Sequence, residues 1–438
     1  MSIRRSFLRR AGALAAIGAA GPLLAPRAAR AADLKFEPER GAKLRVLRWK
    51  RFVQGDEDQW LANTRRFTQL TGVEVQTDSE NWEDLRPKAA VAANVGAGPD
   101  IIVATDEQPH LYPDKLLDLT ELADYLGRKY GGWFDSSREF GMHEGRWIAI
   151  PTGAAGGTMV YRKHMVQAAG FQRFPDDFPG LLKLCRALKA RGTPSGLALG
   201  HATGDANAWC AWVLWGYGGM LADERNHVAI NSRETVAALE YARELYQTFV
   251  PGTASWLDPS NNKAFLAGEI SLTMNGISIY YAAKTSADPK VKALVPDIEH
   301  ALLPVGPSGV PTRAGLAFPA FAFKYTKYPN AAKEYLRFMM EKEQYEPWQG
   351  ASLGYISHSL RAYDSNPVWT ADRQHAYFKD VMQHMRHLGY AGRVGKEAAA
   401  AIADFIVVDM FAEVCVGGRS PAVAAQQAER RAKRHYGA

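Results

Sequence analysis

An alternation of strand-like and helix-like patterns over residues 44–104 most limits the folds open to this chain. Residues 44–49 and 73–76 have the two-residue period of strands, and residues 100–104 form an apolar run typical of a buried parallel strand. Between them, residues 56–70 and 82–95 carry apolar side chains at spacings of three and four, and glycines follow both segments. This order of strand, helix, strand, helix and strand predicts a doubly wound α/β unit.

A second informative pattern lies at residues 264–276. Gly268 follows the apolar end of an expected helix, and residues 270–274 then alternate between apolar and polar side chains, which predicts a strand. Asn275 and Gly276 form a pair that tolerates positive φ, so we expect a turn there. In open α/β sheets ligands bind beyond the carboxyl ends of strands, so this turn is a candidate ligand contact.

The N-terminus has the pattern of an export signal. Arg4 and Arg5 precede an apolar stretch over residues 11–24, and an Ala-Arg-Ala sequence ends at Ala31. This pattern is typical of a twin-arginine signal peptide over residues 1–31, cleaved near Ala31, which predicts a periplasmic mature protein. The alternative is a membrane anchor, but the apolar stretch falls short of the roughly 20 residues that span a bilayer. No cysteine lies near the cleavage point to support a lipid anchor.

The positive charge of the chain comes mostly from this signal. The formal net charge is +7, and residues 1–31 contain six arginines and no acidic residue. The mature chain is therefore close to neutral, which removes the argument for nucleic acid or an anionic membrane as a partner.

Three cysteines, Cys185, Cys210 and Cys415, allow one disulfide in an exported chain, with one thiol left over. No C-x-x-C motif occurs, and no histidine lies at metal-ligand spacing, so we expect no zinc site.

Several motifs together resemble the family 1 extracellular solute-binding proteins, the receptors of bacterial sugar-type ABC importers. The stretch 265–276 resembles a signature of that family. The same is true of the run G-P-D-I-I at residues 98–102 and of the helix start P-N-A-A at residues 329–332. The similar motifs occur in the family's order along nearly the whole mature chain.

This resemblance implies a two-lobe periplasmic binding protein fold of type II. Each lobe would be a doubly wound sheet flanked by helices, with crossover hinge strands between the lobes. The N-terminal lobe would comprise residues 32–150 and 301–348, and the C-terminal lobe residues 151–300 and 349–438. The resemblance also implies a monomer that closes around a small sugar or polyol and delivers it to the importer's permease subunits. It implies no cofactor, neither ATP nor a metal.

We expect the ligand site at strand ends and loops that face the cleft between the lobes. A carboxylate such as Asp106 can accept two sugar hydroxyls, and tryptophan faces stack on sugar rings. The candidate residues of the first lobe are Trp49, Glu80, Thr105 and Asp106. The candidates of the hinge and second lobe are Thr152, Trp209, Trp212, Asn275, Gly276, Arg313 and Tyr355.

Each of these residues also has an ordinary structural interpretation. Trp209 and Trp212 lie at helical spacing and could be core residues, and the others could serve as caps or turns. The glycine-rich loop at 153–157 lacks the Lys-Ser/Thr pair of a nucleotide-binding P-loop. Ser278 stands where the family often has a sugar-stacking aromatic residue, which argues against a long oligosaccharide as ligand.

Other functions remain open at this point. The same fold could bind a glycerol-phosphate-type or other small polar ligand, with Arg313 and the glycine-rich loop as its contacts. A secreted glycoside hydrolase would need paired carboxylates, which Asp56, Glu57 and Asp58 could supply. Acidic residues are also favoured in the first turn of a helix, and that role explains these three more simply. A purely structural or adhesive protein has no sequence repeat in its favour.

Overall fold

The computed structural model describes residues 34–50 and 52–437. The expected signal peptide therefore lies outside the described residues. Lys35–Ala438 form one compact unit, and the description below concerns that unit.

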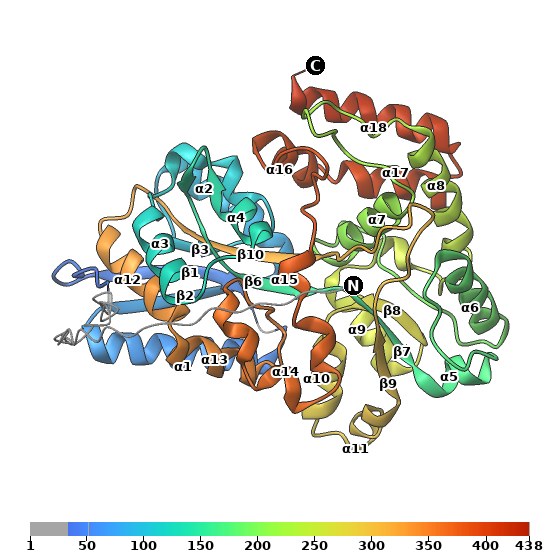
Figure 1. The fold of residues 1–438 in the computed structure, drawn as a ribbon, viewed down its shortest axis with the longest axis horizontal. Coiled ribbons are helices and arrows are strands. Elements are labelled where there is room, and N and C mark those ends of the chain that lie inside the picture. The colour runs from blue at the N-terminus through green and yellow to red at the C-terminus, as the bar shows by residue number, and fades with distance from the viewer. Residues whose placement is uncertain (1–33, 51, 438) are drawn as a thin grey trace, which may run out of the picture. The chain divides into compact units, whose positions relative to one another are not determined.

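The first sheet has five strands in the order β2-β1-β3-β10-β6 (Figure 1). Its strands are β1 (Lys43–Trp49), β2 (Glu74–Glu80), β3 (Ile101–Val103), β6 (Ile150–Gly156) and β10 (Gly315–Ala322). Strand β1 pairs in parallel with β2 and β3, while β10 runs antiparallel to β3 and β6. The doubly wound unit expected from residues 44–104 is thereby confirmed.

Two helices connect the parallel strands of this sheet, α1 (Gln54–Thr71) and α2 (Trp82–Val95). Each ends at a glycine in the left-handed region, Gly72 with φ 73° and Gly96 with φ 70°. A residue with a Cβ would be strained there, so these glycines set the ends of both helices.

The second sheet has three strands in the order β8-β7-β9. They are β7 (Thr158–Arg162), β8 (Leu272–Asn275) and β9 (Ile298–Ala301). The central strand β7 pairs antiparallel with both neighbours, and Leu272 of β8 also forms a parallel bridge with Ser195.

The expected strand and turn at 270–276 differ from the observed ones. The helix α9 (Asp258–Ala267) does end at Gly268 with φ 81°, as the sequence predicts. The strand, however, begins at Leu272 and includes Asn275 as its last residue. The described residues with positive φ do not include Asn275 or Gly276. The Asn275 carbonyl accepts a hydrogen bond from Thr158 Oγ1 at 3.1 Å, which helps to hold the extended backbone through this position.

Helices surround both sheets (Figure 1). The remaining α-helices are α3 (Thr120–Lys129), α4 (Asp135–Gly141), α5 (Lys163–Ala168), α6 (Phe178–Ala190), α7 (Asp205–Gly216), α8 (Arg233–Tyr246), α10 (Ser278–Thr285), α11 (Pro289–Lys292), α12 (Pro329–Met340), α13 (Lys342–Ala351), α14 (Val368–Ala371), α15 (Val381–His384), α16 (Lys396–Ala403), α17 (Ile406–Cys415) and α18 (Pro421–Tyr436). Short 3-10 helices are η1 (Gln108–Leu111), η2 (Pro113–Lys115), η3 (Thr253–Ser255), η4 (Val295–Asp297), η5 (Arg361–Ser365) and η6 (His375–Phe378), and a hairpin is formed by β4 (Met142–His143) and β5 (Arg146–Trp147). Helices α7, α8, α17 and α18 pack on one another and carry much of the large buried cluster beside the second sheet.

The chain passes between the two sheets at three neighbouring places. Only Gly157 separates β6 from β7, and residues 302–314 lead from β9 back to β10. The third connection follows α15, where Met385 forms a bridge with Arg313 of the second connection. The first and third crossings lie close together. A Cβ built on Gly156, next to the first crossing, would lie only 2.2 Å from Cγ2 of Val381 in α15.

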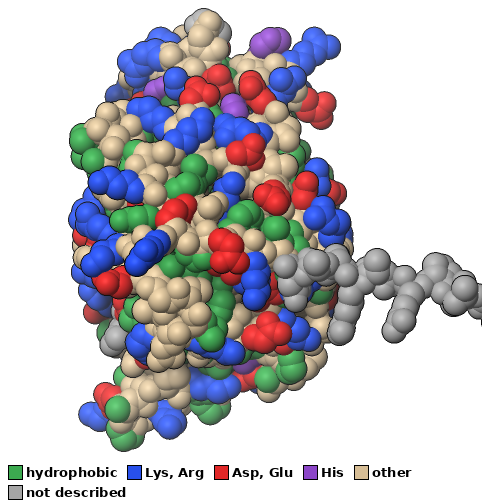
Figure 2. Space-filling model, turned by 90° about the vertical axis from the view of Figure 1, so that its left-hand side faces the viewer, with side chains coloured by type: hydrophobic (Ala, Val, Ile, Leu, Met, Phe, Trp, Pro, Cys, Tyr) green, Lys and Arg blue, Asp and Glu red, His purple; other side chains and the backbone are tan. Residues whose placement is uncertain are grey.

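The described cysteines Cys185, Cys210 and Cys415 are all free thiols, so the disulfide that the sequence allowed is not formed. Burial raises the pKa of both Cys185 and Cys415 to about 12. None of the helices in the described part of the chain combines the length and apolar character required to cross a bilayer. Basic and acidic side chains are interspersed over the face shown in Figure 2.

Candidate functional site

A cavity lies where the chain crosses between the two sheets. Together with the solvent-open space at its mouth, it holds about 510 Å³ between protein atoms. Its lining residues come from both sheets, from the starts of three helices and from the loops between elements. They are Phe52, Trp82, Ala155, Gly156, Gly157, Gly204, Asp205, Ala208, Asp258, Met274, Asn275, Gly276, Gly315, Leu316 and Tyr355.

One wall of the cavity is aromatic. Trp82, the first residue of α2, stacks on Trp49 with ring centroids 4.6 Å apart and an interplanar angle of 17°. It also stacks on Phe318 of β10 at 5.6 Å and 23°. Phe52 and Tyr355 continue this wall, with ring centroids 6.2 Å apart. A flat apolar wall of this kind suits the C–H face of a ring or a chain of carbon atoms.

A buried ion pair holds the aromatic wall from behind. The Asp56 carboxylate accepts hydrogen bonds from Arg48 Nη2 at 2.5 Å, from Trp49 Nε1 at 3.0 Å and from Trp348 Nε1 at 2.8 Å. Arg48 and Asp56 are fully buried, so each charge depends on the other. Asp56 does lie in the first turn of α1, as expected, but it anchors side chains there instead of facing solvent.

Two carboxyl groups, Asp205 and Asp258, also line the cavity. Asp258 Oδ1 accepts the backbone N–H groups of Asp205 at 2.8 Å and of Gly204 at 3.0 Å. These donors lie at the start of α7, where N–H groups have no partner within the helix. Asp205 Oδ2 in turn accepts the side-chain amide of Asn261 at 2.5 Å.

Burial perturbs the titration of both acids. It raises the pKa of Asp258 to about 6, against the lowering effect of the backbone N–H donors. Burial, and secondarily the charge of Asp258, raises the pKa of Asp205 well above its usual range. The two groups can therefore share hydrogen bonds with ligand hydroxyls as acceptors, or as donors where they keep a proton.

Three of the residues expected from the sequence line the cavity: Asn275, Gly276 and Tyr355. The Asn275 amide is held by Asn261 Oδ1 at 3.1 Å, and its oxygen accepts the Gly276 N–H at 2.6 Å. Burial raises the pKa of Tyr355, so its hydroxyl keeps its proton and can donate to a ligand.

Three other expected residues are occupied by structural contacts near the cavity. Trp49 lies behind Trp82, with its ring fully buried. Thr152 Oγ1 donates to the Phe318 carbonyl at 2.8 Å. Asp106 accepts the Ala317 N–H at 3.1 Å, and its buried Oδ2 has no hydrogen-bond partner among the described residues.

Three further candidates also lie outside the cavity lining. Glu80 ends β2 and forms an ion pair with Lys88. Thr105 is buried next to Asp106. The Arg313 guanidinium donates to the Tyr377 carbonyl at 3.5 Å.

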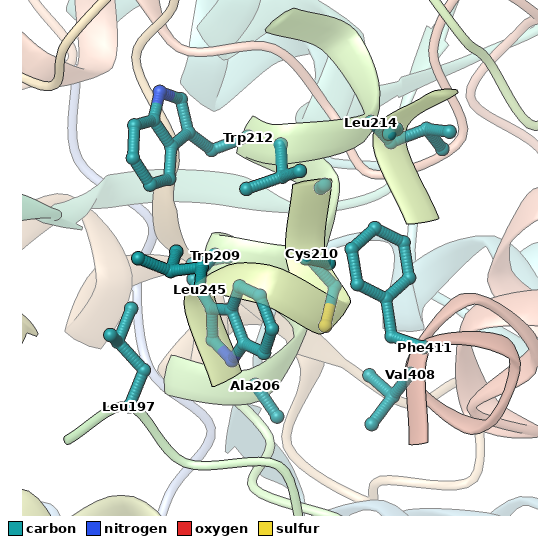
Figure 3. Close-up of a cluster of buried hydrophobic side chains, with 14 of the residues drawn as sticks. Leu197, Ala206, Trp209, Cys210, Trp212, Leu214, Leu245, Val408 and Phe411 are labelled. Carbon is teal, nitrogen blue, oxygen red and sulfur yellow. The ribbon is translucent and has the colours of Figure 1, made fainter. Parts of the chain in front are cut away.

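Trp209 and Trp212 belong to the hydrophobic core (Figure 3). Both are fully buried on α7, and their indole N–H groups donate to the carbonyls of Ala198 at 2.5 Å and Pro304 at 3.0 Å. The alternative interpretation of these residues as core is therefore the one that the structure supports. The physical reason is that α7 is buried along almost its whole length, so spacing alone could not identify a ligand-facing side.

The sequence reasoning missed Phe52, Trp82, Asp205 and Asp258. Trp82, Asp205 and Asp258 are each the first residue of a helix, α2, α7 and α9. Acidic and aromatic residues at predicted helix starts were the signal that could have found them, because helix N-termini commonly face ligand sites.

Solved structures share this fold across nearly the whole chain. The GacH receptor of Streptomyces glaucescens, solved unliganded and with acarbose, has a TM-score of 0.76 at 18% identity, covering 91% of this chain and 99% of that one. Maltose-bound MalE3 of T. maritima also has a TM-score of 0.76 at 18% identity, covering 90% and 99%. A ribitol-bound ABC transporter solute-binding protein of Agrobacterium radiobacter K84 has a TM-score of 0.75 at 17% identity, covering 92% and 100%.

The fold is therefore the two-lobe fold of solute-binding proteins, as the resemblance implied. No curated protein sequence matches the chain. Residues 63–376 match the protein family described as "Bacterial extracellular solute-binding protein", and the chain belongs to this family.

Proposed function

We propose that this protein is the substrate-binding component of an ABC importer and that it captures a small carbohydrate or polyol. The observation that carries this proposal is the cavity at the sheet crossings, which is lined by Trp82 together with Asp205 and Asp258. An aromatic plane and hydrogen-bonding carboxyl groups are complementary to the C–H and O–H groups of a sugar or polyol. Structural neighbours with acarbose, maltose, ribitol and D-mannitol support the same ligand class.

The other functions considered have less support. Membership of a family of solute-binding proteins argues against a secreted glycoside hydrolase. Arg313 is the expected contact for a glycerol-phosphate-type ligand, but this side chain does not line the cavity and donates to the Tyr377 carbonyl instead. Since the described lining residues include no Lys, Arg or His, they favour an uncharged polyhydroxy ligand over a phosphate.

We also propose the division of the mature chain into two lobes, residues 32–150 with 301–348 and residues 151–300 with 349–438, joined by hinge segments. Strand β6 (Ile150–Gly156) belongs to the first sheet and β7 to the second, which supports a hinge at Gly157 and a place for residues 151–156 in the first lobe instead of the second. A ligand that touches both walls binds best in the closed form and shifts the population toward it. The closed form would then deliver the ligand to the permease subunits.

We propose that the protein acts in the periplasm, after export through the twin-arginine route and cleavage near Ala31. We also propose that the mature protein is a monomer. The arginine pair and the following apolar stretch support this route. A family of extracellular proteins agrees with an exported chain.

A thermal-shift screen of residues 32–438 tests the proposed function. The panel contains monosaccharides, disaccharides, polyols, glycerol phosphates and amino acids. A ligand at a hundredfold excess over its Kd stabilises the folded state by about 2.7 kcal/mol, so even a modest binder raises Tm measurably. We expect a shift with one sugar or polyol class and recovery of that ligand unchanged. A shift with glycerol phosphates alone, or chemical conversion of the ligand, would contradict the proposal.

A further inference from the structure

A second, outer pocket adjoins the cavity described above, which is called the inner cavity from here on. Together with the solvent-open space at its mouth, the outer pocket holds about 910 Å³ between protein atoms. It is lined by Glu83, Arg86, Pro87, Ala90, Leu111, Tyr112, His201, Thr203, Leu257, Ala403 and Phe405.

The two spaces share their walls. Trp82 lines the inner cavity and Glu83 the outer pocket, and the same holds for Gly204 with Thr203 and for Asp258 with Leu257. Three separate segments thus each contribute neighbouring residues to both spaces. The Glu83 charge also contributes to the raised pKa of Asp258, which agrees with the short separation. The inner cavity and the outer pocket are therefore adjacent along all three segments.

Two charged side chains in the outer pocket each have a buried polar atom without a hydrogen-bond partner among the described residues. Glu83 and Arg86 lie three residues apart on α2, a spacing at which opposite charges commonly pair, yet they form no ion pair with each other. The buried Oε1 of Glu83 and the buried Nε of Arg86 have no hydrogen-bond partner among the described residues. Unpartnered buried polar atoms cost free energy, and a ligand that bonds to them removes that cost.

Arg86 in particular is prepared for an anion. Burial lowers its pKa, and Asp106, Glu107 and Tyr112 offset that effect only by their charges at a distance, without a hydrogen bond to the guanidinium. A guanidinium has five N–H donors in a planar fork that matches a carboxylate. A carboxylate on a ligand would therefore gain a charge-assisted contact here.

Most of the remaining lining of the outer pocket is apolar, and part of it is aromatic. Phe405 stacks against the His201 ring with centroids 4.4 Å apart and an interplanar angle of 7°. The far ring nitrogen of His201 is occupied by Asp409 at 2.8 Å, which holds the pair in place. Pro87, Ala90 and Leu111 complete the apolar surface, which suits a carbon ring better than another polyhydroxy unit.

We propose that the outer pocket is a second subsite, which binds an apolar group bearing a carboxylate, attached to a carbohydrate held in the inner cavity. This inference rests on the proposed function, since the carbohydrate occupies the cavity assigned there. Arg86 binds the carboxylate, the Phe405 region contacts the apolar group, and Glu83 accepts a hydroxyl group near the junction with Asp258.

Calorimetric titration of residues 32–438 with matched glycosides tests this subsite. The probes are the methyl, phenyl and 4-carboxyphenyl glycosides of glucose, galactose and mannose in both anomeric forms. We expect the 4-carboxyphenyl glycoside of at least one sugar to bind about tenfold or more tightly than its phenyl analogue. Arg86→Gln should reduce that ratio to near one, whereas Arg86→Lys, which keeps the charge, should keep part of it.

Lys88→Gln provides the matched control, because it removes a positive charge from the same helix outside both spaces. It should leave the ratio unchanged. Circular dichroism and Tm of each variant show whether it folds. If the methyl glycosides bind but the 4-carboxyphenyl group adds no affinity, the outer subsite is wrong and the proposed function stands. If none of the glycosides or free sugars bind, both proposals are overturned.

Discussion

The Asp258 carboxylate accepts the backbone N–H of Asp205 at 2.8 Å and thereby fixes the start of α7 at the wall of the inner cavity. One acid holds the helix end, and the other projects from it. Asp258 accepts hydrogen bonds from two backbone N–H groups there, whereas Asp205 accepts one from the side chain of Asn261. This division of roles leads to different expectations for the two acids.

Replacement of Asp205 should weaken ligand binding. Asp205→Asn keeps the size of the side chain but replaces one carboxyl oxygen with an NH2 group, which cannot accept a hydrogen bond from a ligand hydroxyl, so we expect at least a tenfold rise in Kd. Calorimetry with the sugar or polyol found in the thermal-shift screen provides the measurement. Asp124→Asn, an exposed acid on α3, is the matched control and should change Kd by less than twofold. An unchanged Kd for Asp205→Asn would remove this residue from the site.

Asp258 should make stability depend on pH. Its pKa is about 6 in the folded protein and 3.8 in the reference state, so the folded state binds more protons between these values. Its contribution to stability therefore falls as pH rises from about 4 to 7, by up to about 3 kcal/mol. We expect the unfolding free energy of the wild type, relative to that of Asp258→Asn, to fall over this range in urea titrations. Parallel pH profiles of the two proteins would refute this assignment.

Trp82 and Trp212 should respond differently to truncation. Trp212→Ala removes a fully buried side chain from the core and should cost about 3–5 kcal/mol of stability. Trp82→Ala removes the face that the cavity presents to a ligand, so we expect at least a tenfold rise in Kd. Urea unfolding and calorimetry on both variants separate the two roles. A large loss of affinity in folded Trp212→Ala, with none in Trp82→Ala, would reverse the assignment.

Gly156 should be required by the close approach of α15. A Cβ at this position would lie 2.2 Å from Cγ2 of Val381, so Gly156→Ala should cost about 1–3 kcal/mol through overpacking. Val381→Ala removes the clashing methyl groups, and the double variant should recover part of that loss. A double-mutant cycle measured by urea unfolding gives the coupling energy. Strict additivity of the two substitutions would show that the glycine serves another purpose.

Export should depend on the arginine pair at residues 4 and 5. Replacement of both by lysine keeps the charge but changes the residues that characterise a twin-arginine signal. We expect the full-length chain to remain in the cytoplasm, as measured by fractionation and immunoblotting. The same replacement at Arg9 and Arg10 is the control and should preserve export. Normal export of the first variant would point to another route.

Local patterns determined much of the fold. The hydrophobic periods of residues 44–104 predicted the parallel strands and both helices. The glycines after those helices predicted where they end, because the preference of glycine for left-handed backbone is a local property of the residue. Asn275 and Gly276 were placed near a site for a similar reason, since the alternation of residues 270–274 indicated where a strand ends.

Only the tertiary structure decided which side chains face the ligand cavity. Trp49 and Trp82 look alike in sequence, yet the first lies behind the second because Asp56 binds its indole N–H. Asp205 and Asp258 lie 53 residues apart and meet because α7 and α9 start at the same place. Burial depends on every element packed around a residue, whereas a sequence pattern reports only on the element that carries it.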